Sequence, residues 1–252
     1  MTEPRRYLYD NIRVLAPDGT HLSFIPRTRA DWYVRKELAK WEGAKQLRLN
    51  FEPKGRTNVS SWYLVEHKNR CVVCGEEEVH LLQKHHVVPV CLRTWMAPEL
   101  KEHRSFDVLM ICELCHREYE VEAELLKRDL AEEAGLEWLG STKKWKECEA
   151  RSIVIKQAKN LLAGTVHERA AEKLKRNVEA VLGSIPGEEA LAEFGARLKK
   201  DRRDLMAGFY GSLVEAHKPS AGLIVRWRRH FVEMMEPGFL EPEWLADIEV
   251  VK

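Results

Sequence analysis

Two pairs of cysteines constrain this chain more than any other feature of its sequence. Each pair has the C-x-x-C spacing, Cys71 with Cys74 and Cys112 with Cys115. Four thiolates at such spacing can close tetrahedrally on Zn²⁺, and a closed tetrahedron leaves no coordination position open for chemistry. We therefore predict a structural zinc site. The long stretch between Cys74 and Cys112 must then fold as an insert between the two pairs.

The cysteine count also bears on the compartment. The chain has six cysteines, enough in principle for three disulfides, but four are in the pairs and the N-terminal segment lacks the apolar core of a secretory signal. We expect metal binding instead of disulfides, and an intracellular, reducing compartment; cytoplasm, nucleus and organelle are not distinguished. The remaining Cys91 and Cys148 are interpreted as buried free thiols.

The formal net charge of +1 conceals an uneven distribution. Residues 1–70 carry a net charge of +6, residues 71–150 carry −7, and residues 151–252 carry +2. A uniformly basic protein that coats DNA does not have this pattern. Two basic clusters in the C-terminal half could contact phosphates or could be solvated helix faces. Their members are Arg197, Lys199, Lys200, Arg202, Arg203, Arg226, Arg228 and Arg229. No stretch is apolar enough for a membrane span.

The hydrophobic pattern divides the chain into three regions. The first, 1–59, should be a small α+β unit, with a β-hairpin at 11–25 that turns at Pro17-Asp18-Gly19, a helix at 28–41 and a strand at 46–51. The second, 60–134, contains the cysteine pairs. The third, 135–252, should be mainly helical. Helical periodicity predicts helices at 118–133, 143–162, 166–182, 188–216 and 223–235.

Three histidines accompany the cysteines. His85 and His86 are adjacent in the insert, and His116 follows Cys115 directly. Adjacent residues of a strand point to opposite faces, so one imidazole could bind a metal while its neighbour activates water. His116 should lie at the start of the following helix, within reach of the same ion if the strand packs on that helix.

These motifs together resemble the zinc-stapled HNH, or ββα-metal, endonucleases. The resemblance is carried by Cys71-Val-Val-Cys-Gly, His85-His86-Val-Val-Pro and the segment from Asp107 to His116. It implies that His85 and His116 ligate a catalytic Mg²⁺ or Mn²⁺ and that His86 is the general base. Where the family usually has asparagine, five residues before Cys112, this chain has Asp107. An aspartate there could itself ligate the metal, but it cannot donate a hydrogen bond as an amide does.

A second resemblance covers nearly the whole chain. The segments 13–19, 49–56 and 227–231, together with the first cysteine pair and Asp107-Val-Leu, are similar to the region after the exonuclease domain in the family of exonuclease 3′-5′ domain-containing protein two. The exonuclease domain of that family, with its acidic metal ligands, has no counterpart in this sequence. We therefore expect no 3′-5′ exonuclease activity from these residues.

The sequence therefore predicts an α+β protein in which a ββα-metal module with a Cys₄ zinc follows a small α+β unit and precedes a mainly helical region. The expected function is metal-dependent hydrolysis of phosphodiester bonds, and DNA is favoured over RNA as the substrate. A separate exonuclease or another protein could act as partner. The alternative from another class is a catalytically inactive, zinc-stabilised module that binds nucleic acid or docks a protein.

Overall fold

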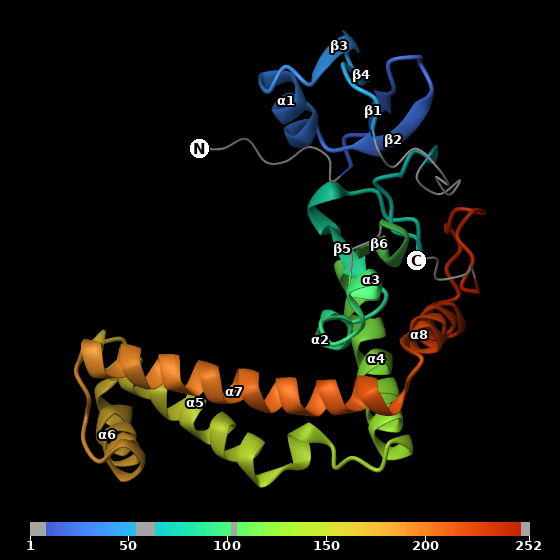
Figure 1. Cartoon of the computed structure of the whole chain (residues 1–252). Coiled ribbons are helices and arrows are strands. Elements are labelled where there is room, and N and C mark those ends of the chain that lie inside the picture. The colour runs from blue at the N-terminus through green and yellow to red at the C-terminus, as the bar shows by residue number, and fades with distance from the viewer. Residues whose placement is uncertain (1–8, 54–63, 102–104, 248–252) are drawn as a thin grey trace. The chain divides into compact units, whose positions relative to one another are not determined.

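The computed structural model describes residues 9–53, 64–101 and 105–247, and its helices and small sheets confirm the α+β class (Figure 1). In chain order the elements are β1 (Ile12–Leu15), β2 (His21–Ile25), α1 (Arg27–Arg35), β3 (Ala39–Gly43), β4 (Gln46–Leu49), η2 (Val79–Leu81), β5 (Leu82–His86), α2 (Val90–Arg93), α3 (Pro98–Lys101), η3 (Ser105–Asp107), β6 (Val108–Cys112), α4 (Glu113–Glu133), η4 (Leu139–Ser141), α5 (Lys143–Leu162), α6 (Glu168–Leu182), α7 (Glu188–Ala216) and α8 (Ser220–Met235). Within these described ranges, no helix combines the length and the apolar character that a membrane crossing requires.

The chain divides into two compact units. The first consists of Met1–Leu125 together with Pro219–Lys252, and the second of Leu126–Lys218. The sequence pattern had instead suggested a single helical region over 135–252. Helix α8 belongs to the first unit, where its Phe231 lies against the rings of His85 and Tyr119. The boundary expected between residues 59 and 60 lies outside the described residues.

The N-terminal strands form a four-stranded sheet of order β2-β1-β4-β3. The predicted hairpin is present, with β1 and β2 antiparallel around the turn at Gly19, whose φ of +90° suits glycine. Strands β1 and β4 pair in parallel, and β3 pairs with β4 antiparallel. A small core that includes Ile12, Val14, Ala30 and Leu47 lies between this sheet and α1.

Helix α1 ends earlier than its sequence pattern suggested. We expected it to continue to Trp41, but Trp41 lies in β3. The stop is Glu37, which has a positive φ of 57°, and the amide of Leu38 donates to the carbonyl of Tyr33. This is the hydrogen-bond pattern of a Schellman cap formed without glycine.

The two-stranded sheet of β5 and β6 is the scaffold of the functional region. The strands are antiparallel, with Leu82 opposite Cys112 and His86 opposite Val108. Helix α4 follows β6 without a loop, so the start of the helix continues directly from the hairpin (Figure 1). The chain after β5 is fixed by a hydrogen bond from the amide of Val87 to the carbonyl of Asp107 at 3.0 Å.

The second unit is made of helices. Helices α5, α6 and α7 share a thin core that includes Val154, Ala158, Val178 and Leu191. The bounds of α5 and α7 agree with the predicted ranges. Helix α5 is capped by Thr142, whose side chain accepts a hydrogen bond from the amide of Trp145.

Candidate functional site

The four paired cysteines, called the cysteine site below, meet beside the hairpin. The donor atoms of Cys71, Cys74, Cys112 and Cys115 all lie within 4.8 Å of one another. The sulfurs of Cys74 and Cys112 are 3.7 Å apart. Cys112 ends β6 and Cys115 lies in the first turn of α4, so both come from rigid elements. The cysteine site can therefore hold a metal ion.

The first cysteine pair lies in a tight turn that requires glycine. The amide of Gly75 donates to the carbonyl of Cys71 at 3.1 Å, and Gly75 has a φ of +83°. A Cβ atom at this position would come within 2.7 Å of the ring of Phe239. The amide of Phe239 in turn donates to the carbonyl of Val72, and the amide of Val72 donates to the carbonyl of Met110. The turn is thus held between β6 and the C-terminal segment.

The acidities of the thiols are consistent with a site that needs a cation. Burial raises the pKa of Cys74, and it raises the pKa of Cys115 far above the usual range. Burial also acts to raise the pKa of Cys71, but hydrogen bonds from the backbone of Cys74 and Cys112 outweigh it, and the net shift is downward. Without a metal most of these sulfurs would keep their protons, so metal binding would release protons.

A second group, called the histidine site below, joins β5 to α4. It consists of His85, His116 and Glu120, whose donor atoms lie within 4.8 Å of one another. His116 Nε2 is 3.6 Å from Glu120 Oε1, and the rings of His85 and His116 are 5.1 Å apart, edge to face. Sequence reasoning missed Glu120. The signal was its i+4 spacing from His116, because residues four apart lie on one face of a helix.

The surroundings of His85 favour coordination of a cation by its imidazole. Its side chain is 5% exposed and lies against the rings of Tyr119 and Phe231. Burial, together with nearby His116 and His86, lowers the pKa of His85 to about 3, so its imidazole is neutral at neutral pH. Its Nε2 atom is buried and has no hydrogen-bond partner among the described residues. In the tautomer that leaves a lone pair on this nitrogen, the unsatisfied lone pair is costly, and a metal ion is one group that would satisfy it.

His86 lies outside this group of ligand atoms. It is the last residue of β5, half-buried, and points to the opposite face of the strand from His85. Its cross-strand neighbour is Val108. The structure therefore keeps the two adjacent imidazoles apart, with one in the histidine site and the other at the end of the strand.

Asp107 is not where the sequence suggested. We expected it beside the catalytic metal, but its carboxylate is buried between two guanidinium groups. One oxygen accepts from Arg93 at 3.0 Å and the other from Arg228 at 2.7 Å. All three side chains are less than 5% exposed. Both oxygens face arginines from α2 and α8, so Asp107 is corrected to a structural anion, and Glu120 is the carboxylate near the histidines.

The basic cluster on α8 also differs from expectation. Arg228 is 2% exposed and is held by Asp107, so it cannot contact nucleic acid in this fold, and that expectation is corrected. Arg229 is exposed but pairs with Asp247 at 2.5 Å. Arg226 is half-buried. This cluster mainly fixes α8 in the first unit.

The basic cluster on α7 lies in the second unit. Arg197 pairs with Glu193 at 2.9 Å, and Arg203 lies 3.6 Å from Asp204. The guanidinium of Arg202 covers the ring of Trp145 at 4.8 Å. Of the predicted residues here, the two exposed lysines are Lys199 and Lys200. The structure does not bring this cluster into the unit that contains the histidine site.

The amino-acid sequence is similar to those of several named proteins. The chain is 28% identical over 256 residues to human exonuclease 3'-5' domain-containing protein 2, an alignment that covers 95% of this chain and 40% of the human protein. The Drosophila melanogaster protein of the same name is 30% identical over 261 residues, with 94% and 42% covered. This chain is homologous to these proteins over nearly all of its length.

A plant protein matches a shorter part. Protein RRP6-like 3 of Arabidopsis thaliana is 35% identical over 133 residues, which are 51% of this chain and 15% of the plant protein. The chain spans about two fifths of the length of the exonuclease 3'-5' domain-containing proteins that it matches. No family model matches the chain, and no solved structure matches it significantly.

Proposed function

We propose that this chain is a metal-dependent endonuclease of the HNH type that hydrolyses phosphodiester bonds, primarily in DNA. The observation that carries the proposal is a buried, neutral His85 grouped with His116 and Glu120, directly before His86 in the chain. A strand-strand-helix arrangement that offers an open metal site, with a further imidazole on the next residue of the strand, has the parts that metal-assisted hydrolysis of a phosphodiester needs.

In this proposal each side chain has one role. His85, His116 and Glu120 hold a divalent ion, which when bound stabilises the negative charge that develops on the phosphate. His86 accepts the proton of the attacking water at a ring nitrogen. Three protein ligands leave coordination positions for water and for a phosphate oxygen. Two imidazoles with one carboxylate favour Mn²⁺ over Mg²⁺, because Mg²⁺ prefers oxygen ligands.

We assign zinc to the cysteine site. Zinc–sulfur bonds of about 2.3 Å in a regular tetrahedron place neighbouring sulfurs about 3.8 Å apart. The 3.7 Å between the sulfurs of Cys74 and Cys112 agrees with this spacing. Four thiolate ligands favour zinc over Mg²⁺ or Mn²⁺ and close the site to substrate. A need for reduced thiols also supports an intracellular, reducing compartment.

The relatives support a partner of the nucleic-acid class. Their names refer to an exonuclease domain, whereas the proposal for this chain is a different, endonucleolytic site. Since the chain spans only part of those proteins, their whole activity is not transferred to it. A separate exonuclease or another protein partner remains part of the proposal.

One observation favours the alternative of an inactive zinc-stabilised module that binds nucleic acid or docks a protein. Asp107 stands where the resemblance places asparagine, and it is fully engaged by Arg93 and Arg228. If hydrolysis needs the N–H donor of an asparagine amide at this position, Asp107 cannot supply it, because a carboxylate held by two guanidinium groups has no donor.

A nicking assay decides between the two. Purified protein is incubated with supercoiled plasmid and with single-stranded DNA in Mn²⁺ or Mg²⁺, beside His86→Ala and a matched control, His80→Ala, whose side chain is exposed. We expect metal-dependent nicking by the wild type and the control, and a loss of about 100-fold or more in His86→Ala. Nicking that survives His86→Ala would refute the mechanism, and no cleavage with any metal would favour the inactive module.

A further inference from the structure

The face of β5 that carries His86 also carries a lysine. Lys84 and His86 are two residues apart in the strand, so they share one face, while His85 points to the other. Lys84 is exposed, and its ammonium lies 4.6 Å from the ring of Tyr9. The hydroxyl of Tyr9 donates to the carbonyl of Val108, the residue opposite His86, at 3.4 Å. Tyr9 and Lys84 therefore lie next to the proposed general base.

A segment before the cysteine site is fixed against the same face. The amide of Tyr9 donates to the side-chain oxygen of Asn69 at 2.8 Å, and the side-chain nitrogen of Asn69 donates to the carbonyl of Tyr9 at 3.0 Å. Asn11 donates to the carbonyl of His67 at 2.8 Å, and the ring centroids of Tyr9 and His67 lie 5.2 Å apart in a tilted arrangement. This ordering positions Lys68 and Arg70 in advance, which lowers the entropic cost of binding.

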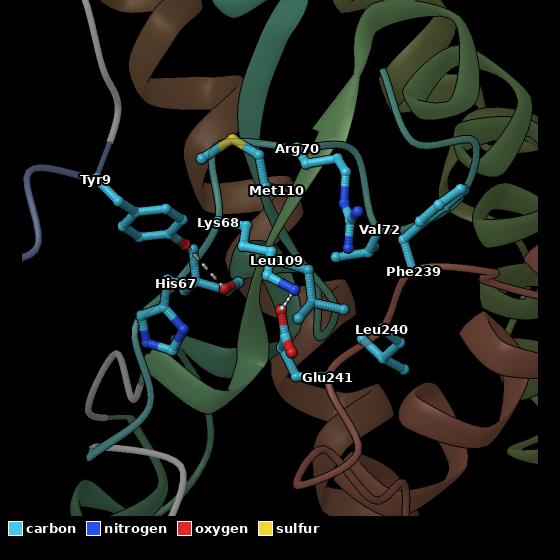
Figure 2. Close-up of a pocket in the computed structure, with 11 residues that line it drawn as sticks. Tyr9, His67, Lys68, Arg70, Val72, Leu109, Met110, Phe239, Leu240 and Glu241 are labelled. Carbon is cyan, nitrogen blue, oxygen red and sulfur yellow. Dashed lines mark hydrogen bonds and ion pairs between the residues drawn. The ribbon is translucent and has the colours of Figure 1, made fainter. Parts of the chain in front are cut away.

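These groups surround a shallow pocket against β6. Figure 2 shows Tyr9 and His67 at one side of the pocket, Arg70 and Phe239 at the other, and Lys68 between them. Its volume is about 30 Å³, roughly the volume of one water molecule. Pockets for small molecules measure about 300–1,000 Å³. The pocket can admit a phosphate oxygen but no nucleobase or free metabolite, so its ligand must lie mainly on the surface.

The charges here favour an anion. Lys68 and Arg70 line the pocket and Lys84 stands beside it, against one lining carboxylate among the described residues, Glu241. Glu241 is 3.5 Å from Lys68, whose side chain is 58% exposed, so this pair is weak. Arg70 lies over the ring of Phe239 at 4.6 Å, a contact through the guanidinium face that leaves N–H donors in its plane.

We propose that Lys68, Arg70 and Lys84 form the surface that binds the backbone phosphates of a nucleic-acid strand and leads it to His86. The inference rests on the proposed function and specifies its substrate contacts. It places them in the unit that contains the histidine site, in place of the cluster on α7. A phosphate backbone is extended and anionic, which matches a shallow basic surface better than a compact ligand does.

The test measures DNA binding apart from cleavage. Fluorescence anisotropy follows fluorescein-labelled duplex and single-stranded DNA at several salt concentrations, without added Mg²⁺ or Mn²⁺. The variants are a triple substitution to alanine at Lys68, Arg70 and Lys84, and a charge-preserving triple, Lys68→Arg, Arg70→Lys and Lys84→Arg. Zinc content and circular dichroism verify that each variant is folded.

Two further variants make the result specific. The first replaces Arg197, Lys199 and Lys200 on α7 with alanine, which removes the same number of charges from the cluster first indicated by sequence. The second is Glu241→Gln, which removes the lining carboxylate and should tighten binding. A gain of affinity in Glu241→Gln cannot arise from misfolding, so it tests the surface even if the alanine triple is unstable.

The expected result is a loss of about tenfold or more in affinity for the alanine triple, with a salt slope that is smaller by about 2 to 3. The charge-preserving triple and the α7 variant should bind as the wild type does. Wild-type affinity in the alanine triple, a loss confined to the α7 variant, or no DNA binding by the wild type would each overturn the inference. The two proposals can also fail separately. If the alanine triple loses DNA binding but the wild type nicks no DNA, the nuclease proposal is refuted and the DNA-binding surface is supported.

Discussion

The cysteine site and the histidine site are built on the same hairpin and helix, yet they differ in almost every physical respect. The cysteine site has four sulfurs and can complete a tetrahedron by itself. The histidine site has three donors, one of them the exposed Glu120, and leaves positions open. Cys115 and His116 are neighbours on α4, about 100° apart around the helix, so one turn of helix supplies both sites. A closed site can only hold shape, whereas an open one can also bind substrate.

The comparison predicts that stability depends on the cysteine site and metal-dependent chemistry on the histidine site. The largest expected effect is the loss of the closed site. Cys112→Ala should abolish cooperative unfolding of the first unit, because structural zinc contributes about 10–16 kcal/mol of binding free energy while whole domains are stable by about 5–15 kcal/mol. Metal analysis and near-ultraviolet circular dichroism measure this. Cys148→Ala, in the second unit, is the control and should retain one zinc per chain. A folded Cys112→Ala protein would contradict a structural role.

The next effect concerns the anion that holds α8 beside the histidine site. Asp107→Asn should lower the free energy of unfolding by about 3–5 kcal/mol, because two buried guanidinium groups lose their counter-ion. By the resemblance alone, asparagine would restore a missing residue, but the two buried arginines make it unfavourable here. Denaturant midpoints give the value.

Adjacent arginines provide the control for this effect. Arg228→Met removes a buried partner of Asp107, whereas Arg229→Met removes an exposed pair with Asp247. The exposed pair should contribute little to the free energy of unfolding, because water screens it. Equal losses in the two arginine variants would show that burial of the ion pair is not the cause.

The regular parts of this fold were predictable and the long-range contacts were not. The bounds of α5 and α7 follow from an uninterrupted helical period that ends at Gly, Pro or Thr signals. The end of α1 was missed because its left-handed residue is Glu37, not glycine. The C-x-x-C spacing predicted that the four cysteines gather, and they do. The metal-ligand roles of His85 and His116 came from the resemblance to HNH endonucleases and stay predictions. The role of Asp107 was not, because Arg228 is 121 residues away in the chain.

A smaller effect separates the histidine site from the rest of the module. His116→Ala and Glu120→Gln should weaken Mn²⁺ binding by about 10–100-fold, as losses of groups around metal sites do. Stability and zinc content should hardly change, because neither side chain is buried. Isothermal titration with Mn²⁺ gives the affinities. Glu118→Gln is the matched control, since Glu118 is exposed on α4 but two residues from Glu120 and thus on another face. Equal weakening by all three variants would exclude a defined site.

The smallest effect tests whether α8 supports the histidine site through shape or through a hydrogen bond. The hydroxyl of Tyr119 lies 3.3 Å from His230 Nδ1 on α8, while its ring packs edge-on against His85 and Phe231. Tyr119→Phe removes only the hydroxyl, so it should cost about 0.5–1.5 kcal/mol of unfolding free energy. Because the ring that confines His85 remains, Mn²⁺ affinity should stay near the wild-type value. If the affinity instead fell as far as in His116→Ala, the hydrogen bond to α8 would be part of the metal site, and the division between a shape-holding site and an open site would have to include the C-terminal helix.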